Sequence, residues 1–307
     1  MTSAVTFTNV TKIFQEEGQE DVTAVDRLSL TVQRGEIFSL VGPDGAGKTT
    51  ILRMMCGVLA PTDGTVEVAG LSLSTQRQEI KNRIGYLSQR FSLYGDLTVD
   101  ENIDFFAEIH KVEDHVERKK ELLDFMRLSA FRDRLAERLS GGMKQKLALA
   151  CTLIHRPEVI FLDEPTTGVD PVSRRDFWKI LSSVLKSGIS IVMATPYLDE
   201  AERSTRVALM NRGRLLICDT PEHVKSTFEH QLIEILCDNP RKAVESLRKG
   251  MKRDAQLFGD RLHVVVGKEG SDLEHVRAEL KNQGITIQSS RTIPPSLEDV
   301  FISRISS

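Results

Sequence analysis

The chain has 307 residues, of which 40% are hydrophobic and 28% are charged. Lysine and arginine total 41 against 44 aspartates and glutamates, so the formal net charge is −3. This balance argues against nucleic acid as the main partner, and the length suits one large core with a smaller second domain.

The sequence has no predicted membrane span, signal peptide or paired cysteine motif, and this bears on where the protein is found. No run approaches the ~18 apolar residues that cross a membrane, and the first residues lack the basic and apolar regions of a signal peptide. The four cysteines are scattered without a Cys-x-x-Cys spacing, so we interpret them as small core residues in a reducing compartment. We therefore expect a cytoplasmic protein.

Strand and helix patterns alternate along residues 1–222, which we expect to form one domain. Alternating apolar and polar residues predict antiparallel strands first, and continuous apolar runs predict buried parallel strands later. The expected strands cover residues 4–13, 28–33, 36–41, 65–68, 83–87, 159–162, 189–194, 207–210 and 215–218. The expected helices cover residues 49–59, 144–154 and 173–186, with another starting within 199–203. Residues 100–139 read as helical, and their charged run 111–121 reads as a solvated face.

The pattern changes after Pro221, and residues 223–307 are expected to form a small accessory domain. The order β-α-β-β-α-β over about 80 residues predicts a ferredoxin-like sandwich. The expected strands cover residues 232–237, 255–258, 262–266 and 285–289, and the expected helices cover 241–249, 273–282 and 296–303.

The segment 42–50 matches G-x-x-x-x-G-K-[ST] between an apolar strand and a helix. Its glycines allow backbone amides to surround phosphates, and the following helix points its positive end at them. Lys48 is expected to reach the β- and γ-phosphates of ATP, and Thr49 to bind Mg²⁺. The predicted nucleotide contacts are Gly42, Pro43, Asp44, Gly45, Ala46, Gly47, Lys48, Thr49 and Thr50.

Two carboxylates end the buried run Val159-Ile-Phe-Leu-Asp-Glu164. Buried carboxylates are costly unless a metal or hydrogen bonds compensate them. Asp163 is therefore predicted to hold Mg²⁺, and Glu164 to act as the base that polarises the attacking water.

The residues Ser140, Gly141 and Gly142 open a third helix and form a second candidate phosphate site. One chain cannot wrap two distant helix starts around one triphosphate. We therefore expect a head-to-tail dimer, with each nucleotide held between opposite chains.

Together these motifs resemble the ATP-binding subunit of an ABC transporter over roughly residues 3–220. The resemblance implies a P-loop NTPase core of ABC type, with a mixed sheet, an antiparallel β subdomain and a helical subdomain. It implies that Phe14 stacks on adenine (the alternative is a core phenylalanine), that Gln89 touches Mg²⁺ and faces the membrane partner, and that Asp170 lies in the loop crossing the dimer interface. It also identifies 139–145 as the signature motif.

Two further segments, 97–102 and 295–301, resemble the ABC-2 exporter type within this family. That resemblance implies a separate transmembrane permease as partner, a second ATPase domain in a homodimer or heterodimer, and a place on the inner face of the cell membrane. A soluble ABC ATPase acting on ribosomes or DNA is a rival hypothesis, but it usually carries two ATPase domains or a long coiled coil. A binding module with negligible turnover is a second rival.

Pro196 stands where the family normally has a histidine that hydrogen-bonds the γ-phosphate. Asp44 is a second departure, since that position is usually asparagine. Both changes resemble the first ATPase half of tandem exporter subunits. Three outcomes remain open: slow hydrolysis through Glu164, pairing with a histidine-bearing second ATPase, or ATP binding with barely any hydrolysis.

Restoring histidine at Pro196 tests this interpretation. Loss of one polar stabiliser of a transition state costs about 10²–10³ in rate, so Pro196→His is expected to raise turnover severalfold, measured as phosphate release at saturating ATP. A fall in turnover, or loss of the fold, would show that the missing-ligand interpretation is wrong.

Overall fold

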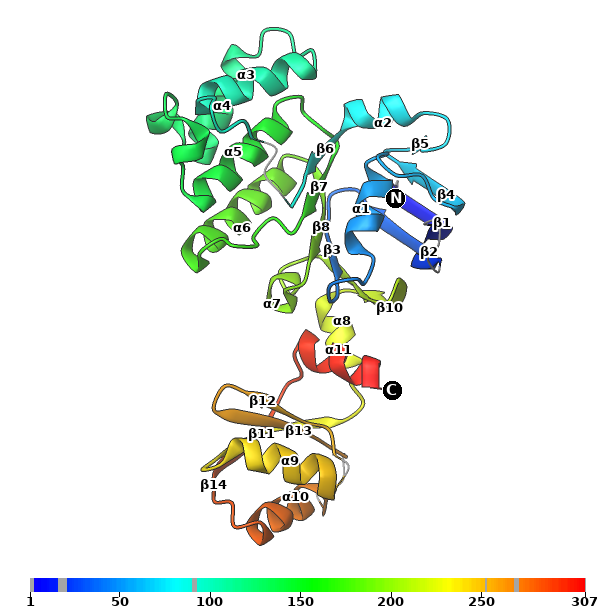
Figure 1. Cartoon of the computed structure of the whole chain (residues 1–307), viewed down its shortest axis with the longest axis vertical. Coiled ribbons are helices and arrows are strands. Elements are labelled where there is room, and N and C mark those ends of the chain that lie inside the picture. The colour runs from blue at the N-terminus through cyan, green and yellow to red at the C-terminus, as the bar shows by residue number, and fades with distance from the viewer. Residues whose placement is uncertain (1–2, 16–20, 90–92, 252, 268–270, 307) are drawn as a thin grey trace. The chain divides into compact units, whose positions relative to one another are not determined.

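The computed structural model describes residues 3–15, 21–89, 93–251, 253–267 and 271–306. The chain forms two compact units, Met1–Pro221 and Glu222–Ser307 (Figure 1). Each unit has its own hydrophobic core. In these described ranges we find no helix with the length and apolar character of a membrane span.

A six-stranded mixed sheet forms the centre of the first unit, in the order β10-β9-β3-β8-β7-β6. Five strands are parallel, and β10 pairs antiparallel with β9 at one edge. Every residue of β3, β7 and β8 is buried, as expected for parallel strands covered on both faces. The bounds are β3 (Ile37–Val41), β6 (Ile84–Leu87), β7 (Val159–Asp163), β8 (Ser190–Thr195), β9 (Arg206–Asn211) and β10 (Arg214–Asp219).

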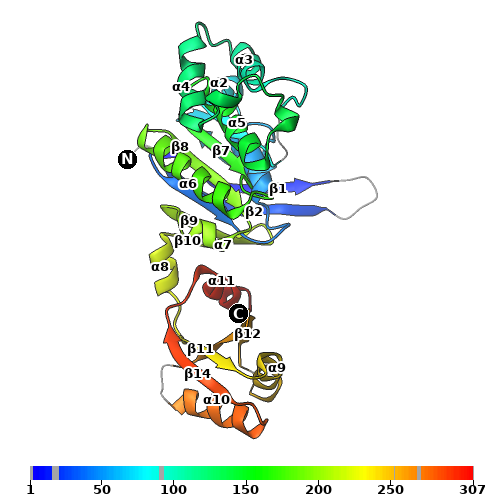
Figure 2. The same ribbon diagram turned by 90° about the vertical axis from the view of Figure 1, so that its left-hand side faces the viewer.

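Helices cover the two faces of this sheet. Helix α1 (Lys48–Met55) lies on one face, and α5 (Gly141–Leu153) and α6 (Pro171–Lys186) lie on the other (Figure 1). Figure 2 shows α6 in front of the sheet. Successive residues of β7 enter different cores, because side chains alternate along a strand: Phe161 joins the core that includes α1, and Ile160 joins the core that includes α5 and α6.

An antiparallel sheet, in the order β2-β1-β4-β5, packs beside α1 and shares its core. Its strands are β1 (Ser3–Phe14), β2 (Val22–Gln33), β4 (Asp63–Val68) and β5 (Leu71–Ser72). The mixed sheet, this antiparallel sheet and the helical region below confirm the predicted fold class of the first domain.

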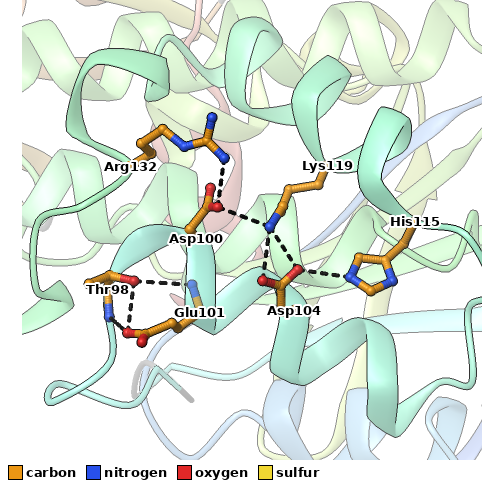
Figure 3. A network of polar contacts seen from close by, with 7 residues as sticks. All are labelled: Thr98, Asp100, Glu101, Asp104, His115, Lys119 and Arg132. Atoms are coloured by element: carbon orange, nitrogen blue, oxygen red, sulfur yellow. Dashed lines mark hydrogen bonds and ion pairs between the residues drawn. The ribbon is translucent and has the colours of Figure 1, made fainter.

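The helical region follows the strand β6 in the chain and stands apart from the antiparallel sheet (Figure 1). An ion-pair network joins α3 to α4 (Figure 3): the Lys119 ammonium lies 2.9 Å from a carboxylate oxygen of Asp100 and 2.8 Å from one of Asp104. Arg132 and His115 contact the same carboxylates at 2.7 and 2.8 Å. The elements after β6 are α3 (Val99–Ile109), α4 (Val116–Met126), η1 (Ser129–Phe131) and η2 (Ala136–Arg138), whereas α2 (Arg77–Arg83) precedes β6 and contacts β5.

The charged run 111–121 differs from its prediction in two ways. It begins as a turn, and α4 starts only at Val116. Lys119 is 8% exposed, so the prediction of a solvated face is wrong at this residue. The charge of Lys119 suggested that its side chain is exposed to solvent. Two carboxylates on α3 pair with it instead, which lowers the cost of burying the ammonium.

Helix α1 ends at Met55, four residues before its predicted end. Gly57 has φ 68°, its amide donates to the Met54 carbonyl, and the Val58 amide donates to the Arg53 carbonyl. This is a Schellman stop, which glycine favours because it has no Cβ. After this stop Leu59 packs against the core, whereas Val58 is exposed.

The second unit has the strand order β12-β13-β11-β14, with all neighbours antiparallel. Helices α9 and α10 share a core with the sheet, as the predicted β-α-β-β-α-β sandwich requires. The bounds are β11 (Gln231–Cys237), α9 (Pro240–Gly250), β12 (Ala255–Phe258), β13 (Arg261–Val266), α10 (Ser271–Asn282), β14 (Ile287–Ile293) and α11 (Leu297–Ser306), with α8 (Pro221–Ser226) before them.

Strand β14 begins two residues later than predicted and extends to Ile293. Gly284 has φ 73° and its amide donates to the Lys281 carbonyl, while the Ile285 amide donates to the Leu280 carbonyl. Ile285 is buried because it closes the end of α10, so its apolar character reported a helix stop rather than a strand.

The network of Figure 3 yields a stability prediction. Lys119→Met leaves the half-buried carboxylates of Asp100 and Asp104 without their shared cation, so we expect the free energy of unfolding to fall by about 1–3 kcal/mol. Urea unfolding followed by the fluorescence of Trp178 measures this change. Trp178 is the single tryptophan, and it is buried in the core to which α3 and α4 contribute.

The control is Lys179→Met, which breaks an exposed ion pair with Asp176. Such pairs contribute at most about 1 kcal/mol, so this variant should unfold close to the wild type. Equal losses in both variants would contradict a special role for Lys119.

Candidate active site

The loop between β3 and α1 has the backbone that a phosphate cradle needs. Gly45 and Gly47 have φ 78° and 95°, in the left-handed region that glycine favours. A Cβ on Gly42 would lie 2.2 Å from the Met210 carbonyl oxygen, and one on Gly47 would lie 2.4 Å from that of Ala24. Neighbouring backbone therefore excludes side chains at both positions, and α1 starts directly behind the loop.

The rest of the loop is divided between a tip and an anchor. Pro43 and Asp44 are exposed at the tip, and Thr50 is half-buried in α1. Ala46 is buried, and its carbonyl accepts a 3.2 Å hydrogen bond from the amide of Gly213. The β9–β10 hairpin, turned at Gly213, thus braces the loop from behind.

Lys48 lies inside the curl of the loop. Its Nζ donates to the carbonyls of Gly42 (2.7 Å) and Pro43 (2.9 Å), and the residue is only 4% exposed. Burial lowers the pKa of Lys48, and the carboxylates of Glu164, Asp44 and Asp163 oppose that shift. An ammonium held by neutral carbonyls in this way gains strongly from an anionic phosphate.

Asp163 ends β7 beside the start of α1. Its Oδ1 accepts a 3.0 Å hydrogen bond from Thr49 Oγ1, and its Oδ2 accepts one of 3.4 Å from the Tyr86 hydroxyl. Burial raises the pKa of Asp163, against the hydrogen bond from Thr49. A cation would relieve the buried charge. Two oxygens 3.0 Å apart match neighbouring ligands of an octahedral Mg²⁺, whose bonds of about 2.1 Å place such oxygens about 3 Å apart.

Glu164 follows Asp163 with φ 48°, an uncommon conformation for a residue with a side chain. Its amide donates to the Ala194 carbonyl of the neighbouring strand at 2.9 Å. Its carboxylate accepts from Gln89 Nε2 (2.9 Å) and Thr167 Oγ1 (3.2 Å). The structure therefore brings Gln89 and Glu164 together, and the left-handed turn fixes where the carboxylate points.

The second helix start lies elsewhere on the unit. Ser140 caps α5, with its Oγ accepting from the Met143 amide at 3.4 Å. A Cβ on Gly142 would lie 2.5 Å from Ser173 Oγ, so Gly142 allows α5 to pack against α6, while Gly141 is exposed. Figure 1 shows α1 and α5 on opposite faces of the sheet.

Asp170 caps α6, where its Oδ1 accepts from the amides of Val172 (3.1 Å) and Ser173 (3.0 Å). Hydrogen bonds from Ser173 hold the pKa of Asp170 below its usual value. Phe14 ends β1 with 41% of its surface exposed, and Lys12 Nζ lies 5.2 Å from its ring centre. The alternative of a core phenylalanine is therefore wrong.

Pro196 follows the last residue of β8 and is half-buried. The loop stays closed without a donor at this position, because the Tyr197 amide donates to Thr195 Oγ1 at 3.0 Å.

The sequence reasoning missed a buried carboxylate just beyond, Glu200, which accepts from Thr166 Oγ1 at 2.6 Å. It also missed Tyr86. No motif marked either contact, since each joins segments distant in sequence.

Comparison with known proteins gives the family. The ABC transporter family model matches residues 25–167, and the model for the C-terminal domain of DrrA1-3-like ATP-binding proteins matches residues 220–305. The chain is 35% identical to the Nod factor export ATP-binding protein I of Sinorhizobium fredii, over 97% of this chain and 85% of that one. This chain belongs to the ATP-binding proteins of ABC transporters.

Two further likenesses agree with that membership. The "Probable multidrug ABC transporter ATP-binding protein YbhF" of Escherichia coli is 39% identical over 71% of this chain, which spans only 40% of YbhF. A dimeric ATP-binding cassette in a post-hydrolysis state, bound to ADP and Pi, superposes with a TM-score of 0.65 and 25% identity, over 70% of this chain and 98% of that one. ABC ATP-binding proteins bind and hydrolyse ATP, and the loop around Lys48 suits that ligand.

Lys48 supplies the prediction of this site. Lys48→Ala removes a charge-assisted contact to phosphate, and such bonds contribute about 1.5–3 kcal/mol, so ATP affinity should fall roughly 10- to 100-fold. Titration with a fluorescent ATP analogue measures it. Lys186→Ala, at an exposed position in the last turn of α6, is the matched control and should bind as the wild type does. If Lys48→Ala bound ATP with unchanged affinity, the proposal that the nucleotide binds at this loop would be wrong.

Proposed function

We propose that this protein is the ATP-hydrolysing motor subunit of an ABC-2 type exporter, cytoplasmic and peripheral on the inner face of the membrane. ATP binding closes a head-to-tail dimer, and hydrolysis with release of products reopens it. The family membership, the export role in the name of the Nod factor relative and the multidrug transport role in the name of YbhF support this proposal.

The observation that carries the hydrolytic part is the fixed carboxylate of Glu164 beside the Thr49–Asp163 pair. Glu164 is held by Gln89 and Thr167 at the end of β7, one residue after Asp163. We assign to Glu164 the role of the base for the attacking water, and to Lys48 that of phosphate ligand. Thr49, Asp163 and Gln89 are the proposed Mg²⁺ residues, and the ion would neutralise phosphate charge.

The dimer supplies the rest of the proposed site. Because α1 and α5 cover opposite faces of one sheet, Ser140, Gly141 and Gly142 of one copy would meet the nucleotide bound by another. Asp170 at the start of α6 lies in the loop proposed to cross the interface. Phe14 presents an exposed ring for adenine.

A cavity beside Gln89 suits the contact with the permease. Its volume is about 290 Å³, and it lies between β6, α3 and α5, with Leu93, Phe106 and His110 in its wall together with Ser88, the residue before Gln89. Mixed apolar and polar lining next to Gln89 fits a short amphipathic helix of a membrane protein, so that movement there reaches Glu164 through one side-chain hydrogen bond.

We further propose that residues 1–222 act as the motor and 223–307 as an accessory domain.

Pro196 and Asp44 favour a second candidate: an ATP-binding subunit of weak turnover that pairs with a competent second ATPase. Pro196 lacks a hydrogen-bonding side chain, and Asp44 adds a negative charge near Lys48. The missing donor at position 196 would slow hydrolysis, while the glycine cradle around Lys48 is intact and would still hold ATP.

Glu164→Gln separates an enzyme from a binding module. The variant keeps the shape of the carboxylate but not its basicity, so phosphate release should fall about 10²–10⁴-fold while ATP affinity is retained. Purified wild type and variant are compared by phosphate release and by nucleotide titration, with Lys48→Ala as the binding-deficient reference.

Equal phosphate release by the two proteins would contradict the role of Glu164. Wild type that binds ATP without any turnover would favour the second candidate. Co-purification of the tagged chain with a multi-span membrane protein tests the exporter assignment, and its recovery with ribosomes or DNA instead would favour a soluble ABC ATPase.

A further inference from the structure

Glu200 is a buried carboxylate that holds three segments of the first unit together. It lies in α7 (Leu198–Ala201) and is 1% exposed. Its Oε1 accepts from Thr166 Oγ1 at 2.6 Å and lies 3.3 Å from Arg174 Nε. Its Oε2 accepts from Thr195 Oγ1 at 3.3 Å.

Each segment that Glu200 contacts carries a residue of the active site. Thr166 follows Glu164 by two residues, and Thr195 directly precedes Pro196. Arg174 lies in the first turn of α6, where its amide donates to the Asp170 carbonyl at 2.9 Å. Glu200 itself is distant from the phosphate loop in sequence and belongs to none of the sequence motifs described above.

The contacts form a closed circuit around the loop at Pro196. Thr195 Oγ1 donates to Glu200 and accepts from the Tyr197 amide, so one hydroxyl spans the proline. The Arg174 guanidinium, paired with Glu200, also lies 5.0 Å from the Tyr197 ring centre. Because proline contributes no amide hydrogen, these contacts fix the path of the chain on either side of it.

The arrangement is more specific than stability alone requires. A carboxylate this buried is costly, and burial raises the pKa of Glu200 against the hydrogen bond from Thr166 and the charge of Arg174. An apolar side chain would fill the same space without that cost. What the carboxylate adds is directed bonds to two hydroxyls, one in the turn after β7 and one at the end of β8, whose spacing sets where Glu164 lies relative to position 196.

We propose that Glu200 is a positioning residue for hydrolysis, which couples the Glu164 turn, the Asp170 helix start and the loop at Pro196 into one rigid element. The inference rests on the proposed ATPase function. It predicts that loss of the Glu200 charge lowers the rate of the chemical step without weakening ATP binding.

The chain offers a matched control in Glu36. This carboxylate is 4% exposed, pairs with Arg206 at 3.2 Å and precedes β3 at the opposite end of the sheet from the active site. Burial raises the pKa of Glu36, as it does for Glu200, and Arg174 and Arg206 have the same exposed side-chain fraction, 27%. Glu36→Gln therefore removes an equivalent buried charge without touching the site.

The first experiment compares Glu200→Gln with Glu36→Gln in the full chain. We expect kcat for ATP to fall about 10- to 100-fold in Glu200→Gln with KM within about twofold, and both constants to stay near wild type in Glu36→Gln. Fluorescence of Trp178 checks that both variants remain folded. Equal losses of kcat in the two variants, or unchanged kcat in Glu200→Gln, would overturn the proposal.

Hydrogen exchange gives a readout that needs no turnover. Glu200→Gln should speed amide exchange in both 164–170 and 195–201, whereas Glu36→Gln should change neither segment. Wild type that binds ATP but never hydrolyses it would refute the motor proposal, and exchange would still decide whether Glu200 couples the two segments. Unaltered exchange in Glu200→Gln refutes the coupling.

A third comparison separates positioning from packing. If Glu200 fixes the loop at position 196, the gain in turnover from Pro196→His should shrink at least severalfold when Glu200→Gln is also present. The gain should survive in the Glu36→Gln background. A gain of the same size in both backgrounds would limit Glu200 to a packing role.

Discussion

The hydrogen bond between Thr49 and Asp163 is the contact on which the site depends. It joins the first turn of α1 to the end of β7, two elements 114 residues apart in sequence, and so closes the gap between the phosphate cradle and the acids. Burial disfavours the charged form of two groups at this contact: it raises the pKa of Asp163 and lowers that of the neighbouring Lys48. A nucleotide bound with Mg²⁺ would offer the lysine an anion and the aspartate a cation at once. The whole ligand would therefore relieve both groups together, which neither charge could do by itself.

Much of this arrangement could be predicted because it depends on short sequence patterns within single segments. The phosphate loop combines a strand, a fixed glycine spacing and a helix start, and the acids at Asp163 and Glu164 end an apolar run that only a covered parallel strand explains. The second unit was equally readable, since its strands and helices alternate with clear periodicity. In both cases the backbone, rather than any distant partner, dictated the residue type.

Two of the misses, Lys119 and Glu200, share a physical cause, since the partners of each lie on other segments of the chain. Lys119 read as solvated because its two carboxylate partners lie on another helix, and Ile285 read as a strand residue because its burial closes the end of α10. Glu200 gave no signal for the same reason, since its hydroxyl partners come from the ends of two different strands. Periodicity predicts which face of a helix or strand is buried, but not which side chains of other elements contact that face.

The departures at Pro196 and Asp44 leave the backbone of the phosphate loop in place. The cradle is made of backbone and glycine, and both are undisturbed: Gly42 and Gly47 still meet neighbouring carbonyls too closely for any side chain. The loop at Pro196 keeps its path through Thr195 and Tyr197, so only a side-chain donor is missing. In a homodimer both composite sites would lack that donor, whereas in a heterodimer with a histidine-bearing partner only one would. The two arrangements therefore differ in how many of the proposed composite sites lack the donor, whereas the cradle around Lys48 is the same in both.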